Sequence, residues 1–76
     1  MSVTMYSTPS CGYCNLAKDY FRRNKIAFTD YNVATDPQKA EEMVRKSGQM
    51  GVPVIDVNGK VIVGFNQGAI ESALKR

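Results

Sequence analysis

Two β-rich runs joined by an Asn-Gly pair are the feature that most constrains the fold of this chain. The runs cover residues 52–57 and 60–63, and Asn58-Gly59 separates them. A two-residue Asn-Gly connection favours a type I′ turn, because both central residues of that turn need positive φ angles. The sequence therefore predicts an antiparallel β-hairpin in its C-terminal half.

The N-terminal half has the pattern of a strand, a helix and a second strand. Residues 3–7 and 26–33 favour strands, and Pro9 breaks the first run before a segment with helical spacing. Asn24 is a plausible end of that helix. Strand, helix and strand in this order form a right-handed parallel crossover. The apolar stripe of the helix is expected to contain Leu16, Ala17, Tyr20 and Phe21.

Two further helices flank the hairpin in the sequence. Asp36 and Pro37 supply N-cap and N1 residues, and Gly48 is placed to end the second helix in the left-handed conformation. Residues 64–68 lead into the last helix. The expected buried positions of the second helix are Ala40, Met43, Val44 and Ser47, and those of the third are Ala69, Ile70, Ala73 and Leu74.

The resulting order is β-α-β-α-β-β-α, an α/β fold with one mixed sheet. A parallel crossover and an antiparallel hairpin in one sheet require helices on both of its faces. We find no internal repeat, low-complexity tract or linker, so residues 1–76 are expected to form a single small domain.

The net charge of +3 indicates solvated helix surfaces and not a nucleic-acid site, since no interleaved aromatic motif accompanies the cations. The start of the sequence lacks a basic region followed by an apolar one, and no apolar run approaches the roughly 20 residues that span a bilayer. We therefore expect a cytoplasmic monomer without a nucleic-acid or membrane partner. The cations behind this charge are mainly Lys18, Arg22, Arg23, Lys25, Lys75 and Arg76.

The two cysteines, Cys11 and Cys14, lie where the first strand gives way to the first helix. A disulfide between them closes a very short loop and stabilises little, so their role is chemical. Unpaired N–H groups and the helix dipole stabilise a thiolate at Cys11, near the N-cap, and the spacing lets Cys14 attack a mixed disulfide formed on Cys11. The chain has no histidine, which excludes a Cys-His catalytic pair.

Two residues close to the cysteines have two interpretations each. Lys18 follows Cys14 by one turn on the same helix face, where it either supports the thiolate or is ordinary solvated surface. Tyr13 either packs beside an incoming thiol or shields the adjacent core.

A metal site is the chief alternative for the cysteine pair. A closed zinc site needs four ligands, and two thiolates without histidine supply only half of them. We therefore predict redox chemistry and no metal ligand.

The dipeptide Val52-Pro53 at the head of the third strand also has two interpretations. It is either an ordinary start of an edge strand, or a cis peptide that presents the Val52 backbone to an extended thiol substrate.

Cys-x-x-Cys after the first strand, Val-Pro before the third and glycine after the fourth together resemble the glutaredoxins of the thioredoxin superfamily, over essentially the whole chain. The resemblance implies a thioredoxin-like fold with a four-stranded mixed sheet and three helices. It also implies that Cys11 is the nucleophile, Cys14 the resolving cysteine and Pro53 a cis-proline. Residues at substrate- or glutathione-binding positions are then Tyr13, Val52, Pro53 and Gly64.

The chain departs from the usual glutaredoxin pattern at three places. Gly12 replaces the proline of CPYC, and Thr8 stands where many members have a lysine. The usual Gly-Gly and acidic residues after the fourth strand appear here as Gly64-Phe65-Asn66-Gln67-Gly68. Gln49 or Gln67 are candidates to replace the missing glutathione contacts.

The expected activity is that of a glutaredoxin-like thiol–disulfide oxidoreductase that reduces protein disulfides or glutathione mixed disulfides. It needs no organic cofactor, and glutathione is a possible reducing co-substrate. The Gly64-Phe65 pair is also similar to the small electron donors of ribonucleotide reductase that thioredoxin reductase reduces. A third possibility is an iron–sulfur carrier with a [2Fe–2S] cluster between two protomers, suggested by the small residue Gly12.

Overall fold

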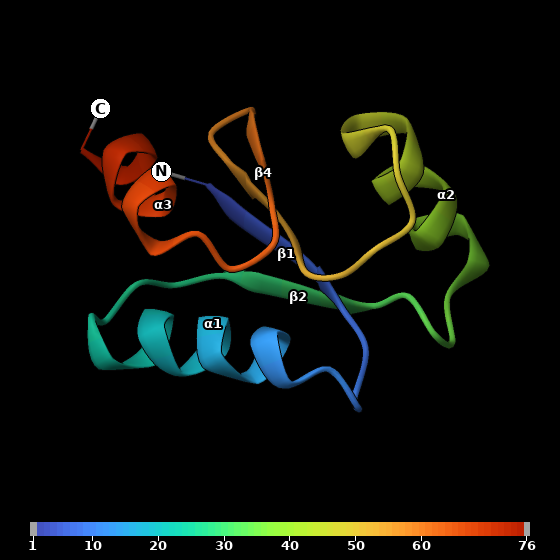
Figure 1. Ribbon diagram of the computed structural model, residues 1–76, viewed down its shortest axis with the longest axis horizontal. Coiled ribbons are helices and arrows are strands. Elements are labelled where there is room, and N and C mark those ends of the chain that lie inside the picture. Colours follow the sequence, from blue (N-terminus) through green and yellow to red (C-terminus); the bar gives the residue numbers. More distant parts are fainter. Residues whose placement is uncertain (1, 76) are drawn as a thin grey trace.

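The computed structural model describes residues 2–75, so Met1 and Arg76 of the expected domain lie outside it. Its seven elements confirm the predicted order (Figure 1). They are β1 (Val3–Ser7), α1 (Gly12–Arg23), β2 (Thr29–Asn32), α2 (Pro37–Ser47), β3 (Val54–Val57), β4 (Lys60–Val63) and α3 (Gln67–Leu74).

The four strands form one mixed sheet in the order β2-β1-β3-β4. Strand β1 pairs parallel with β2 and antiparallel with β3, which in turn pairs antiparallel with β4. Asn58 and Gly59 both have positive φ angles, 53° and 93°, as the predicted type I′ turn requires. The hairpin is confirmed, although β3 begins two residues later than expected.

Helices cover both faces of the sheet, as predicted, because successive side chains of a strand point to opposite faces. Val3 and Met5 of β1 lie in the larger buried cluster, which α1 and α3 cover, whereas Tyr6 lies in a second cluster with Met43 of α2. Figure 1 shows α2 on the opposite side of the sheet from α1. Both cysteines lie on the α1 side.

The predicted stripe of α1 is wrong at one position. Ala17, Tyr20 and Phe21 are buried, but Leu16 is 49% exposed. Cys14 is fully buried and shifts the apolar face toward positions 14, 17 and 21, whose spacing of three and four residues places them in one row.

The second strand is shorter than the predicted 26–33, because the end of α1 takes up part of this segment. The Ile26 N–H donates to the Phe21 carbonyl at 2.8 Å and the Lys25 N–H to the Arg22 carbonyl at 3.1 Å. Lys25 has a φ of 56°. This is a Schellman motif with lysine at the left-handed position, so β2 starts only at Thr29.

The ends of α2 are as predicted. The Asp36 carboxylate accepts from the Lys39 N–H at 3.1 Å, and Gly48 is left-handed with a φ of 77°. Only Met43 of its expected buried face is fully buried, while Ala40, Val44 and Ser47 are half-buried. In α3, Ile70 and Ala73 are buried, and Ala69 and Leu74 pack against them at the edge.

A polar network fixes α2 to the sheet. The Tyr6 hydroxyl donates to the Glu42 carboxylate, and this hydrogen bond is the main reason that the pKa of Glu42 lies below its ordinary value. Burial, followed by the same hydrogen bond, raises the pKa of Tyr6. Lys46 bridges to Asp56 of β3 at 2.8 Å. The network thereby fixes the helix from which the Val52 segment departs.

Candidate active site

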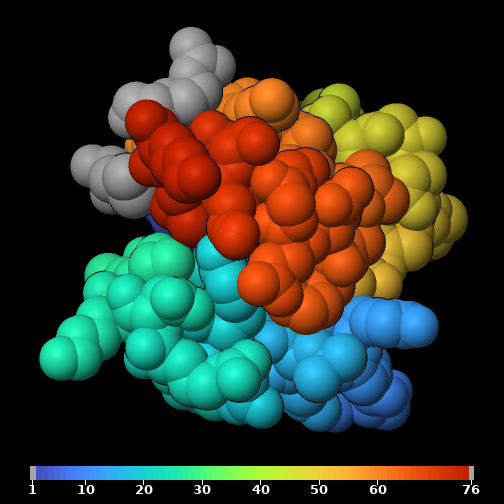
Figure 2. Space-filling view, turned by 60° about the vertical axis from the view of Figure 1, so that its left-hand side comes forward, coloured from blue at the N-terminus to red at the C-terminus, as the bar shows by residue number. Residues whose placement is uncertain are grey.

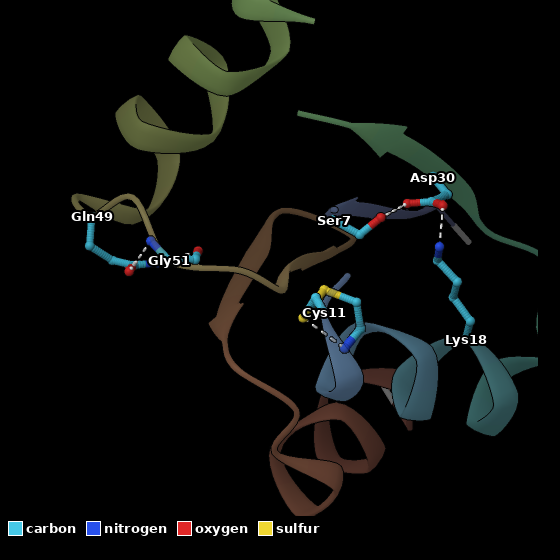
Figure 3. The surroundings of a disulfide bond; sticks show 7 residues. Ser7, Cys11, Lys18, Asp30, Gln49 and Gly51 are labelled. Atoms are coloured by element: carbon cyan, nitrogen blue, oxygen red, sulfur yellow. Dashed lines mark hydrogen bonds and ion pairs between the residues drawn. A yellow bond between two sulfur atoms is a disulfide. The ribbon is translucent and has the colours of Figure 1, made fainter. Parts of the chain in front are cut away.

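Cys11 and Cys14 are joined by a disulfide at the start of α1 (Figure 3). Cys11 is the N-cap residue, with extended backbone angles, and its sulfur accepts the Cys14 N–H at 3.1 Å. The two Cα atoms are 5.2 Å apart, within the range that a disulfide needs. The predicted placement is confirmed: the Cys11 sulfur faces an N–H group that has no partner within the helix.

The two sulfur-bearing residues differ in accessibility. Cys11 is half-buried and Cys14 is fully buried, at 0% exposed. An incoming molecule therefore meets Cys11, while Cys14 is shielded by the core on which it packs. This asymmetry suits two different roles in an exchange reaction.

Lys18 is not ordinary solvated surface, because it forms a half-buried ion pair, while its support of the thiolate stays a prediction. Its ammonium lies 2.9 Å from one oxygen of Asp30, and the other oxygen of Asp30 accepts the Ser7 hydroxyl at 2.6 Å (Figure 3). Ser7 is buried at the end of β1. Ser7 and Asp30 have no local signal in the sequence, since only the parallel pairing of β1 with β2 brings them together. The positive charge of Lys18 is thereby balanced.

The Val52–Pro53 peptide is cis. The interpretation as an edge-strand start is wrong, because β3 lies inside the sheet, between β1 and β4. The Pro53 carbonyl accepts the Gly64 N–H at 2.8 Å, and Gly64 has a φ of 81°. Within residues 2–75, neither the N–H nor the carbonyl of Val52 has a hydrogen-bond partner. Val52 packs against the buried cluster that contains Cys14, and Cys11 packs against the same cluster.

Tyr13 is 67% exposed, and both of its interpretations stay predictions. With Gly12 and Leu16 it lines an open hollow of about 400 Å³ beside the cysteines. A larger hollow of about 560 Å³ lies between α1 and α3 and is lined by Tyr20, Glu71 and their neighbours. Its lining includes neither cysteine, and Figure 2 shows this face, with α3 above α1. The smaller hollow is therefore the one that lies next to the cysteine pair.

Gln49 and Gln67, the two candidate replacements for charged residues, lie on different elements. The side chain of Gln49 is folded back onto the backbone of Gly51. Gln67 is the exposed first residue of α3. Three segments surround the cysteines, residues 8–16, 49–53 and 64–68, and none of them contains a charged side chain.

Across residues 2–75 no three histidine, cysteine, aspartate or glutamate side chains cluster as metal ligands would. None of the helices formed by those residues is long and apolar enough to cross a membrane.

Fold and site together define a thioredoxin-fold protein with a redox-active cysteine pair at the start of its first helix. The family model described as Glutaredoxin matches residues 3–62. The chain thus belongs to the glutaredoxin family.

Individual relatives agree with this assignment. An uncharacterized glutaredoxin-like 8.6 kDa protein of the rubredoxin operon of Clostridium pasteurianum is 43% identical over 74 residues, which cover 97% of this chain and 99% of the relative. The solved structure of NrdH-redoxin from Escherichia coli, a glutaredoxin-like protein with a thioredoxin-like activity profile, is 26% identical with a TM-score of 0.85 and covers 95% and 93% of the two chains. The glutaredoxin of Archaeoglobus fulgidus shares the fold, with a TM-score of 0.90 at 20% identity over 99% of this chain and 87% of that one.

Proposed function

We propose that this protein is a thiol–disulfide oxidoreductase in which Cys11 is the nucleophile and Cys14 the resolving cysteine. The observation that carries the proposal is the hydrogen bond from the Cys14 N–H to the sulfur of the half-exposed N-cap Cys11. That N–H and the positive end of the helix dipole favour negative charge on the Cys11 sulfur.

The reaction consists of two exchanges. The Cys11 thiolate attacks one sulfur of a substrate disulfide, which forms a mixed disulfide and releases the first substrate thiol after it takes up a proton. The thiolate of Cys14 then attacks the Cys11 sulfur, which forms the Cys11–Cys14 disulfide and releases the second thiol. Two electrons pass from the cysteine pair to the substrate, and an external thiol reductant restores the pair.

A single-turnover experiment tests this assignment. Reduced protein, freed of reductant, is mixed with an excess of a disulfide-linked peptide, and we expect one peptide disulfide to be reduced for each Cys11–Cys14 disulfide formed. With Cys14→Ser we expect a stable mixed disulfide at Cys11, visible by mass spectrometry as a protein carrying one peptide. A wild-type protein that yields no free peptide thiol would refute the proposed function.

The three uncharged segments around the cysteines, the rim of the site, also bear on which reductant restores the cysteine pair. Glutathione carries two carboxylates and an ammonium group, and such groups are normally matched by charged or well-oriented polar partners. None of the segments 8–16, 49–53 and 64–68 offers a charge, and Lys18 is paired with Asp30. We therefore favour reduction by a thioredoxin reductase, in keeping with the thioredoxin-like activity of the related NrdH-redoxin.

Re-reduction rates of the oxidised protein distinguish the two reductants. We expect faster reduction by NADPH and thioredoxin reductase than by glutathione at physiological concentration. Thr8→Lys adds a cation at the rim and should raise the glutathione rate by up to about fivefold, the range of an exposed ion pair. Lys60→Arg, on the distal hairpin, is the control and should change neither rate. Wild-type reduction that is faster with glutathione would contradict this preference.

A further inference from the structure

The segment between α2 and Pro53 is held by hydrogen bonds at every residue except Met50 and Val52. Its anchor is Ser47 in the last turn of α2, whose hydroxyl contacts both the Gln49 carbonyl at 2.9 Å and the Gln49 N–H at 3.3 Å. The backbone of Gln49 is thus tied to the helix. Its side chain is free to reach along the chain toward the site.

The Gln49 side-chain amide binds both backbone groups of Gly51. Its Oε1 accepts the Gly51 N–H at 2.6 Å, and its Nε2 donates to the Gly51 carbonyl at 3.0 Å. Figure 3 shows this side chain closed on Gly51, from which the chain continues toward the disulfide. The paired contacts satisfy the same two groups that a neighbouring β-strand would satisfy. We call this arrangement the Gln49 clamp.

Val52 therefore lies between two fixed backbone positions. On one side the Gln49 clamp holds Gly51, and on the other the Pro53 carbonyl accepts the Gly64 N–H at 2.8 Å. The N–H and carbonyl of Val52 have no partner within residues 2–75. Their orientation is set before any substrate arrives, which lowers the ordering cost of binding.

We propose that Gln49 is a positioning residue, whose clamp on Gly51 holds the Val52 backbone as a preset edge for an extended polypeptide segment beside the substrate disulfide. The inference rests on the proposed function and deepens it, because it assigns the site a peptide substrate read through its backbone. The clamp leaves the sulfur chemistry untouched. Loss of the clamp therefore affects substrates with backbone amides and spares disulfides without them.

The structure supplies two independent ways to open the clamp. Gln49→Ala removes the amide. Gly51→Ala acts from the other side, since a Cβ at Gly51 would lie 2.7 Å from the Gln49 Oε1, and the three atoms nearest to it all belong to the Gln49 side chain. The same substitution is therefore harmless once Gln49 is alanine, and the two changes should be non-additive.

The experiment compares single-turnover rate constants of the reduced protein with two disulfides. One is the dimer of acetyl-Ala-Cys-Ala-amide, and the other is bis(2-hydroxyethyl) disulfide, which has no amide. We expect Gln49→Ala and Gly51→Ala each to slow the peptide reaction roughly three- to tenfold, the cost of reordering a rotamer-rich segment. The double variant should be no slower than Gln49→Ala, and all of them should match the wild type with bis(2-hydroxyethyl) disulfide.

Gln38→Ala, an exposed glutamine in the first turn of α2, is the matched control and should behave as the wild type. Wild-type rates with the peptide for Gln49→Ala would overturn the inference, as would an equal loss with both disulfides, which indicates general disruption of the site. Additive effects of the two substitutions would also overturn it. A wild type that reduces neither disulfide contradicts the proposed function itself, so the two failures are distinguishable.

Discussion

Replacement of Cys11 by serine is expected to reduce disulfide reduction to the background rate without protein. A serine hydroxyl forms no mixed disulfide, and its oxygen stays protonated at neutral pH, so the hydrogen bond from the Cys14 N–H has no anion to stabilise. The remaining cysteine does not compensate, since Cys14 is fully buried behind position 11. Steady-state reduction of a disulfide-linked peptide measures the loss.

Two further variants complete this test. Cys14→Ser should keep the first exchange and stop at the mixed disulfide, so its burst of one released thiol persists while turnover is lost. Ser10→Ala changes the exposed neighbour of Cys11 and should retain wild-type turnover. If Cys11→Ser turned over at more than a few per cent of the wild-type rate, another group would have to be the nucleophile.

The parts of the fold that the sequence predicted well are those fixed by local chemistry. Asn58-Gly59 encodes a turn in two residues, Gly48 encodes a left-handed helix end, and Cys11 at a strand-to-helix junction encodes an N-cap sulfur. Each of these depends on neighbours within about four residues. These features can therefore be predicted from the sequence alone.

The parts of the fold that could not be predicted from the sequence depend on contacts between residues that are distant along the chain. Cys14 was interpreted as a chemical group only, but it is also a core residue, and that second role moves the buried face of α1 away from Leu16. Lys25 has a left-handed conformation, although glycine is the residue usually found in that conformation. Because of it, β2 begins later in the sequence than predicted. Lys18 is partnered by Asp30 across the fold, so its environment follows from tertiary packing.

The Gln49 clamp was missed for a different reason. Glutamine followed two residues later by glycine is a common pattern with no fixed meaning, and the resemblance to glutaredoxins makes Gln49 a candidate for glutathione contacts instead. In the structure the side-chain amide of Gln49 is hydrogen-bonded to the backbone of Gly51. What marks the clamp is the close approach of the Gln49 Oε1 to Gly51, which follows from the fold and not from the local sequence.

Truncation of Phe21 is expected to be the most destabilising single change in α1. Phe21 is fully buried and its ring lies 5.2 Å from that of Phe28 and 5.7 Å from that of Tyr20, measured between centroids. Phe21→Ala should lower the free energy of unfolding by about 3–5 kcal/mol, because both the transfer of the ring and the cavity contribute. The total free energy of unfolding of a domain of this size is roughly 4–11 kcal/mol. Urea unfolding of the oxidised protein, followed by circular dichroism, measures the change.

Leu16→Ala is the matched control, because it also shortens an apolar side chain of α1. Leu16 is 49% exposed, so the substitution should cost less than about 1 kcal/mol. If Phe21→Ala is too unstable to give a folded baseline, Phe21→Leu keeps part of the volume and should still cost more than Leu16→Ala. If Phe21→Ala and Leu16→Ala lowered the free energy of unfolding equally, Cys14, Ala17 and Phe21 would not form the buried face of α1. The same buried face holds Cys14 behind Cys11, so this stability measurement also tests the packing on which the roles of the two cysteines depend.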